Sequence, residues 1–394
     1  MSPRAGETPQ VFVRRATKPS LVETPTLIIG AGPAGLAVAG RLRQAGLAFV
    51  IIEKSDRVGD SWHRHYERLH LHTVKQLSHL PGLEFPEEYP RYVPRQELAD
   101  YYDDYARTFS IEPLFGEEAQ TVRRSDDTWL TTTGTGLEIS SDHVVVATGL
   151  NQAPHQPDYP GVEDFTGRIV HSREYRNPDP FLGEKVLVVG MGNTGAEIAL
   201  DLSEAGVETT MSVRGPVNIV PRDVLGRPTQ LTARMLARLP VAVGDRIGTL
   251  LRRMTVGDLT GYGITTPDIA PLAQLRERGK TPVIDVGTVE AIKKGQIAVR
   301  PAIDHFETDR VVFTDGGEGR HDTVILATGY RPLLEDLLPD PHDLLDEKGL
   351  PRQVSGDGPN RGLFFVGFDN HRPGGVLGTV VEESAEVVEQ IRRG

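Results

Sequence analysis

Two glycine-rich motifs, each between an apolar strand and a helix, constrain the fold of this chain more than any other feature. The first spans residues 30–35 and the second spans residues 190–195, and both read G-x-G-x-x-G. In such a motif the first glycine permits a tight turn and the second lets the backbone approach a pyrophosphate. The third lets the helix pack close to the strand. The chain is therefore predicted to contain two dinucleotide-binding β-α-β units.

The surroundings of the first motif are typical of a complete β-α-β unit. Residues 26–30 form an apolar strand, residues 37–46 have helical spacing, and residues 48–53 form a second apolar strand. Pro33 suits the first helical turn, where its missing N–H costs nothing. Glu53 ends the second strand, where an acid accepts ribose hydroxyls. The residues assigned to this site are Gly30, Gly32, Pro33, Ala34, Gly35, Glu53 and Lys54.

The second motif has the same context with one difference. A strand over 185–190, a helix over 194–206 and a strand over 208–214 are predicted, and the last strand ends in Arg214 instead of an acid. An acid would repel a 2′-phosphate, whereas arginine binds it through charge-assisted hydrogen bonds, so NADPH is favoured over NADH. Arg222 is either a second contact or a solvated surface arginine. The residues assigned to this site are Gly190, Gly192, Asn193, Thr194, Gly195, Ser212, Arg214 and Arg222.

Two dinucleotides in one chain imply reactive rings that meet. The unit with the acid suits FAD, and the chemistry is then hydride transfer from the nicotinamide of NADPH to the flavin. Two A-T-G segments are expected where the chain passes between domains, because small residues let the backbone run close to a cofactor; simple strand ends are the alternative. These segments are Ala147, Thr148 and Gly149, and Ala327, Thr328 and Gly329.

The predicted fold class is α/β, with two Rossmann-like domains of the glutathione-reductase-like type and a smaller NADPH-binding domain inserted in the FAD-binding domain. Residues 1–23 are expected to be a flexible leader. Residues 24–155 and 329–394 form the FAD-binding domain, and residues 156–328 form the NADPH-binding domain. Residues 229–256 mix apolar residues with arginines and are predicted to be two surface helices; a substrate lid or a membrane-resting patch are the alternatives.

The last segment of the chain predicts a further part of the flavin site. An amphipathic helix over 375–393 follows Pro373 and Gly374. Reduced flavin carries negative charge on its pyrimidine side, and a helix N-terminus there would stabilise it. Asp369 is placed to accept a ribityl hydroxyl. An ordinary terminal helix behind a polar loop is the alternative.

Five of the 12 histidines fall between residues 63 and 79. Residues 68–73 alternate as a strand, with His70 and His72 on one face. No carboxylates cluster beside them in the sequence, so we predict polar contacts near the flavin or in the core, and no metal site.

The composition excludes several classes of function. The chain has no cysteine, which excludes disulfides, thiolate metal sites and the disulfide reductases that share both glycine motifs. A net charge of −12 disfavours nucleic acid as a partner. No stretch approaches the ~20 apolar residues that span a bilayer, and the first 25 residues show no secretory signal. A cytoplasmic protein without a membrane partner is expected, and an oligomer is left open.

Residues 165–175 match the pattern F-x-G-x-x-x-H-x-x-x-Y, with its histidine at His171 and its tyrosine at Tyr175. With this pattern between two glycine motifs, the chain resembles the class B flavoprotein monooxygenases, specifically the flavin-containing monooxygenases. The aromatic residue at Tyr175 favours this branch over the Baeyer–Villiger branch, which typically has tryptophan there.

Further segments resemble the YUCCA-type indole-3-pyruvate monooxygenases and their bacterial relatives. These are Trp62 and residues 68–95, 219–226 and 283–299. The resemblance implies that Lys75 and Gln76 lie beside the flavin ring and position oxygen or substrate. It also implies that His171 lies at the hinge between domains and acts in NADPH handling. Trp62 and His72 join the predicted flavin contacts.

The mechanism implied by the resemblance begins with reduction of FAD by NADPH. Oxygen then gives a C4a-(hydro)peroxyflavin, and one oxygen atom enters a small-molecule substrate. Attack on nitrogen or sulfur and oxidative decarboxylation of a keto acid both stay open. The alternatives are an NADPH oxidase or flavin reductase without oxygen transfer, and a non-enzymatic redox sensor.

Overall fold

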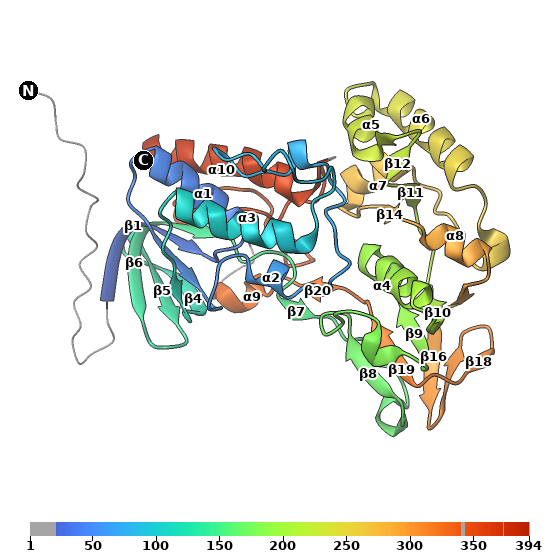
Figure 1. The fold of residues 1–394 in the computed structure, drawn as a ribbon. Coiled ribbons are helices and arrows are strands. Elements are labelled where there is room, and N and C mark those ends of the chain that lie inside the picture. The colour runs from blue at the N-terminus through green and yellow to red at the C-terminus, as the bar shows by residue number, and fades with distance from the viewer. Residues whose placement is uncertain (1–20, 340–342, 373, 394) are drawn as a thin grey trace, which may run out of the picture.

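The computed structural model describes residues 21–339, 343–372 and 374–393, which form two lobes side by side (Figure 1). The first lobe is built on a seven-stranded sheet, and the second on a five-stranded sheet in which every pair of neighbours is parallel. The predicted α/β class with two dinucleotide-binding folds is confirmed.

In the first sheet, four strands and the late strand β21 pair in parallel, and a hairpin extends the sheet. The strands in parallel pairs are β3 (Leu114–Phe115), β2 (Val50–Glu53), β1 (Leu21–Ile29), β6 (Glu138–Val146) and β21 (Leu363–Phe365). The antiparallel hairpin consists of β5 (Thr128–Thr133) and β4 (Ala119–Ser125). The first half of β6 pairs with β5 and its second half pairs with β21. Since β1 lies between β2 and β6, the turn after β1 lies where the chain order reverses, which is where such sheets bind ligands.

Strand β1 begins earlier than predicted. Leu21 to Glu23 pair in parallel with Glu138 to Ser140, so the expected leader was too long by these residues. The pairing follows from an alternation that starts at Val22, which is 2% exposed and packs in the core of this lobe. Residues 1–20 of the predicted leader lie outside the described residues.

Three helices cover one face of the first sheet (Figure 1). They are α1 (Pro33–Gln44), α3 (Arg95–Thr108) and α10 (Gly375–Arg393). Pro33 occupies the first turn of α1, as predicted. A Cβ on Gly40 of α1 would lie 2.1 Å from the hydroxyl oxygen of Tyr105, so this glycine lets α1 and α3 approach closely. The short helices α2 (Asp60–His63) and α9 (Leu334–Leu337) lie in connections of this lobe.

The second sheet has the order β15, β10, β9, β19 and β8. Its strands are β15 (Ile297–Arg300), β10 (Glu208–Ser212), β9 (Lys185–Val189), β19 (Thr323–Leu326) and β8 (Arg168–His171). Helix α4 (Asn193–Glu204) packs on one face, and a small antiparallel sheet packs on the other. The small sheet consists of β16 (Ile303–Glu307), β17 (Arg310–Phe313) and β18 (Glu318–Gly319). Like the turn after β1, the turn after β9 leads from a strand between two parallel neighbours into a helix.

The chain passes between the lobes twice, and the two passages pair with each other. Strand β7 (Ala153–Pro154) is antiparallel to β20 (Tyr330–Arg331), and both lie between the lobes in Figure 1. The domain boundaries predicted after 155 and 328 lie beside this pair of strands, and they remain a prediction.

Residues 229–256 form the two predicted helices, α5 (Thr229–Leu236) and α6 (Val241–Thr255). Between β10 and these helices, β11 (Ile219–Pro221), β12 (Asp223–Val224) and β13 (Arg227–Pro228) form short pairs, and β11 pairs with β14 (Val283–Asp285). Helices α7 (Pro271–Arg278) and α8 (Thr288–Lys293) complete the second lobe.

The segment after α2 joins the two lobes. Tyr66 and Leu69 pack in the core of the second lobe, whereas Leu71 packs in the core of the first. The apolar alternation in 68–73 therefore reflects two cores and not one face of a sheet. The predicted strand is wrong, because this stretch makes only an isolated bridge between His70 and Pro94.

A buried hydrogen bond fixes this junction. The Tyr66 hydroxyl donates to Oε2 of Glu197 in α4 over 2.8 Å, and Glu197 is only 4% exposed. A buried carboxylate needs such donors, because without them its desolvation is uncompensated.

We expect Tyr66→Phe to lower the free energy of unfolding by about 1–3 kcal/mol, because one oxygen of a buried carboxylate loses its donor. Tyr102→Phe is the matched control, since the Tyr102 hydroxyl is buried without a hydrogen-bond partner in the described structure. Denaturant unfolding of the three proteins measures the difference. Equal losses in the two variants would contradict the assigned role of the Tyr66–Glu197 bond.

Candidate active site

The first glycine loop has the geometry that a bound pyrophosphate requires. Gly30 has φ of +105°, and an added Cβ there would lie 2.7 Å from the carbonyl oxygen of Ala147. A Cβ on Gly35 would lie 1.9 Å from the carbonyl oxygen of Gly30, whereas a Cβ on Gly32 would meet no atom within 4 Å. The first and third glycines thus serve close packing, and the second leaves free space beside the backbone.

The second loop repeats this geometry. Gly190 also has φ of +105°, and its added Cβ would lie 2.7 Å from the carbonyl oxygen of Ala327. A Cβ on Gly195 would lie 2.0 Å from the carbonyl oxygen of Gly190, and Gly192 again has free space around it. Each A-T-G segment therefore begins with the alanine whose carbonyl contacts the first glycine of a motif.

The polar groups around the first loop suit FAD. Oε2 of Glu53 accepts the Ala31 N–H over 2.7 Å, so the carboxylate lies beside the loop at the end of β2. The Thr148 hydroxyl oxygen is buried without a hydrogen-bond partner in the described structure, as expected of a group that meets a ligand. Lys54, in contrast to Thr148, has a partner within the protein, because its exposed ammonium donates to Oε1 of Gln152 over 2.7 Å. Ala34 lies in the first turn of α1, and Gly149 directly follows Thr148.

Around the second loop, two of the predicted contact residues form hydrogen bonds within the protein, and a third has an exposed side chain that suits a phosphate. The Ser212 hydroxyl is buried and donates to the carbonyl of Pro301 over 2.8 Å. Oδ1 of Asn193 accepts the Ile284 N–H over 2.7 Å and ties the start of α4 to β14. Arg214 is exposed just beyond β10 and forms no ion pair with the described residues, which suits a 2′-phosphate. Thr194 follows Asn193 in the first turn of α4.

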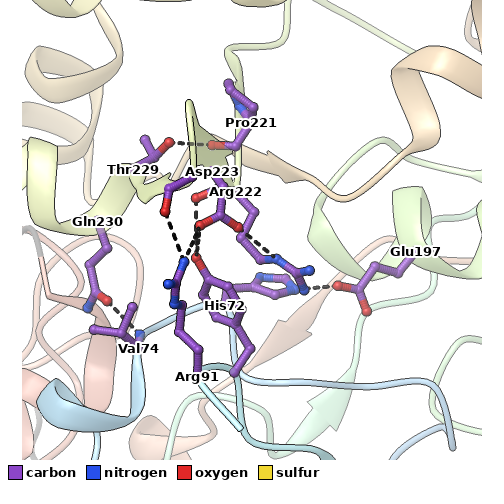
Figure 2. A network of polar contacts seen from close by, with 11 residues as sticks. His72, Val74, Arg91, Glu197, Pro221, Arg222, Asp223, Thr229 and Gln230 are labelled. Carbon is purple, nitrogen blue, oxygen red and sulfur yellow. Dashed lines mark hydrogen bonds and ion pairs between the residues drawn. The ribbon is translucent and has the colours of Figure 1, made fainter.

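Arg222 contacts the first lobe (Figure 2). Its guanidinium carbon lies 4.3 Å from the centre of the Tyr92 ring, and its Nε lies 3.7 Å from Oδ2 of Asp223. The Tyr92 hydroxyl and Arg91 Nη1 reach Oδ1 of Asp223 at 2.9 and 3.3 Å. Arg222 is therefore part of a contact between lobes, and its binding of a 2′-phosphate remains a prediction.

His171 lies at the passage between the lobes. Its Nδ1 accepts the Arg173 N–H over 3.1 Å, and its Nε2 faces the Gly329 carbonyl oxygen at 3.2 Å. These partners assign the neutral tautomer that donates from Nε2. Burial lowers the pKa of His171, which also favours the neutral imidazole. His171 thus ties the end of β8 to the second passage, next to Thr328, whose hydroxyl donates to the His155 carbonyl.

The predicted flavin-side residues differ in their surroundings. Lys75 Nζ reaches the carbonyl oxygens of Pro86, Glu87 and Tyr89 at 3.4, 2.8 and 2.7 Å, so all three of its donors have partners. These three hydrogen bonds tie Lys75 to the loop over 86–89. Gln76, in contrast, is exposed.

Trp62 and His72 lie at the junction of the lobes. The Trp62 ring packs edge-on to Tyr102, with centroids 6.5 Å apart. His72 Nε2 contacts Oε1 of Glu197, so the two oxygens of that carboxylate are held by two residues of the segment that joins the lobes, Tyr66 and His72 (Figure 2 shows the His72 contact). The contacts of Trp62 and His72 with the cofactor remain predictions.

The loop before α10 contains Asp369, and α10 itself contains a buried acid, Glu383, that the sequence analysis missed. Oδ1 of Asp369 accepts the His371 N–H over 2.7 Å. Oε2 of Glu383 accepts the Gly367 N–H over 2.7 Å, and burial raises the pKa of Glu383 to about 7. An acid at helical spacing from the buried Val380 and Val387 was the available signal. Pro373, named with this helix start, lies outside the described residues.

The raised pKa of Glu383 predicts a pH dependence. Between about pH 4.5 and pH 7 the folded protein binds this proton more strongly than the unfolded chain, so the free energy of unfolding falls as pH rises through this window. Glu383→Gln keeps an acceptor for Gly367 and removes the buried charge, so we expect a flatter profile and higher stability at pH 8. Denaturant unfolding from pH 4.5 to 8 measures it.

Glu389→Gln, at an exposed position of the same helix, is the control. It should retain the wild-type dependence on pH. A wild-type profile in the Glu383→Gln variant would refute the assignment.

Within residues 21–339, 343–372 and 374–393, no group of three or more His, Cys, Asp or Glu side chains is arranged to hold a metal ion. In the same ranges no helix is both long and apolar enough to cross a membrane.

Comparison with known proteins places this geometry in a family. The family described as pyridine nucleotide-disulphide oxidoreductase matches residues 27–229. The indole-3-pyruvate monooxygenase YUCCA1 of Oryza sativa subsp. japonica is 39% identical over 90% of this chain and 88% of its own length. The probable indole-3-pyruvate monooxygenase YUCCA8 of Arabidopsis thaliana is 36% identical over 87% of this chain and 83% of its own length.

Among solved structures, the flavin-containing monooxygenase from Stenotrophomonas maltophilia is similar, with a TM-score of 0.69 and 25% identity. The match covers 94% of this chain and 98% of that one. The two dinucleotide-binding folds agree with this similarity, and the cofactors are FAD and NADPH. The chain belongs to the flavoprotein monooxygenase family that includes the indole-3-pyruvate monooxygenases, and it is an FAD- and NADPH-dependent monooxygenase.

Proposed function

We propose that this enzyme oxidatively decarboxylates a 2-oxo acid with an aromatic side chain, of the indole-3-pyruvate kind. The observation that carries the proposal is the 39% identity to an indole-3-pyruvate monooxygenase over 90% of the chain. The substrate, O2, NADPH and a proton give the acid shortened by one carbon, CO2, NADP⁺ and water. One atom of O2 enters the new carboxylate and the other leaves as water.

The bound flavin supplies hydride acceptance and reaction with oxygen. The residues of the chain bind and orient the cofactors. We propose that the two glycine loops hold the pyrophosphates, that Glu53 binds the ribose of FAD, and that Arg214 binds the 2′-phosphate of NADPH. Asp369 is proposed to accept a ribityl hydroxyl, and the N-terminus of α10 to stabilise the reduced ring.

Two cations that could pair with the substrate carboxylate are already engaged. Lys75 donates to three carbonyls, as described above. Nε of Arg372 lies 3.0 Å from Oδ2 of Asp369, and its Nη1 lies 2.7 Å from Oε2 of Glu382. We therefore propose that both are structural, with Lys75 and Gln76 acting on the site through the position of their backbone.

The proposal is tested with the purified holoenzyme, NADPH and ¹⁸O2. Indole-3-pyruvate and phenylpyruvate are compared with an amine and a sulfide. We expect the shortened acids with a single ¹⁸O atom and one NADPH consumed per product. N-oxide or sulfoxide as the main product would replace the proposed substrate class. Peroxide equal to the NADPH consumed with every compound would reject oxygen transfer.

The role of Arg214 gives a separate prediction. We expect Arg214→Ala to raise KM for NADPH about 10- to 100-fold with little change in kcat, because charge-assisted hydrogen bonds to the phosphate are lost. KM for NADH should stay the same, since NADH has no 2′-phosphate. Steady-state kinetics with both nucleotides measures this.

Arg222→Ala serves as the comparison. A loss with NADPH alone would assign Arg222 to the phosphate as well, and equal losses with both nucleotides would assign it to the Tyr92 contact. If KM rises equally for NADPH and NADH in Arg214→Ala, Arg214 does not bind the phosphate.

A further inference from the structure

The side chain of Gln230 in α5 joins the second lobe to two backbone groups of the first. Its Oε1 accepts the Val74 N–H over 2.8 Å, as Figure 2 shows. Its Nε2 donates to the Gly374 carbonyl over 3.0 Å. Both ends of the amide are therefore used, and they bind groups that lie far apart in the sequence.

These two backbone groups flank the predicted position of the flavin ring. Val74 precedes Lys75 and Gln76, and Gly374 precedes the start of α10. The two segments touch each other, because a Cβ on Gly375 would lie 2.9 Å from Cγ2 of Thr73. Gln230 thus spans the contact between a loop and a helix start that are both assigned to the ring.

Helix α5 is anchored at the residue before Gln230. The Thr229 hydroxyl donates to the Pro221 carbonyl over 2.5 Å, and the Thr229 N–H donates to the Arg222 carbonyl over 2.9 Å (Figure 2 shows the first contact). The remainder of α5 is more open, with Leu231 and Met235 37% and 46% exposed. The first turn of α5 is therefore the fixed end, and Gln230 extends from it.

We propose that Gln230 is a positioning residue that clamps the two segments beside the flavin ring to the second lobe and keeps bulk water out of the site. The inference rests on the proposed position of the ring and gives α5 a role in the reaction. Water exclusion matters because it suppresses loss of the activated oxygen as peroxide. The clamp needs an amide, since it must accept from one backbone group and donate to another.

Two variants test the clamp in the FAD-loaded enzyme. Gln230→Leu removes both hydrogen bonds, and Gln230→Glu keeps the acceptor for Val74 but has no donor for Gly374. With NADPH, O2 and indole-3-pyruvate, we expect peroxide released per NADPH to rise about fivefold or more in both. KM for NADPH and FAD content should match wild type, which separates a clamp from general damage.

Gln96→Leu is the matched control, because Gln96 is exposed on α3 and bonds only to Asp100. A second readout does not depend on turnover: iodide should quench the flavin fluorescence of both Gln230 variants more strongly than that of wild type and Gln96→Leu. Unchanged peroxide yield and unchanged quenching in both Gln230 variants, or an equal rise in the control, would overturn the proposal.

The two proposals fail in different ways. If wild type makes no shortened acid, the proposed substrate class fails and the quenching comparison still tests the clamp. If wild type couples NADPH to product and the Gln230 variants do so equally well, only the clamp fails.

Discussion

The structure depends on one close contact that occurs twice. The first glycine of each motif lies so near the carbonyl of the alanine directly after the neighbouring strand that no side chain fits between them, at Gly30 with Ala147 and at Gly190 with Ala327. Each contact fixes the turn at the carboxyl edge of its sheet, where the strand order reverses. Because the A-T-G segments lead directly into the two passages between lobes, the same contacts that shape the loops also direct both sites toward the junction.

The sequence predicts the parts of this fold that are local. A strand, a turn with glycines at fixed spacing and a helix can be recognised without knowing what packs on them, so both β-α-β units, α10 and the helices over 229–256 are found. The stretch over 68–73 fails for a physical reason. Leu69 and Leu71 are buried in different lobes, and this produces an alternation that a single strand would also produce.

In the candidate site, too, the sequence predicts residues with local roles and misses residues whose roles depend on distant partners. The glycines and Glu53 were identifiable because their roles follow from backbone geometry and strand position. Glu197, Glu383 and Gln230 were not identified, because their roles depend on partners far away in the sequence. Lys75 illustrates the converse: its position was inferred from resemblance, but only the structure shows that three carbonyls occupy its ammonium.

The contacts of Glu197 connect the second glycine loop to the segment beside the predicted flavin ring. Helix α4 begins at the second glycine loop, and one turn further along it the buried carboxylate accepts from Tyr66 and contacts His72. The chain continues from His72 to Val74 and the turn beside the predicted flavin ring. Since a buried carboxylate is costly to separate from its partners, the loop proposed to bind NADPH and the segment beside the predicted flavin ring are held in one arrangement. A hydride donor and acceptor held by different lobes need such a tie, because the transfer depends on the distance and orientation of the two rings.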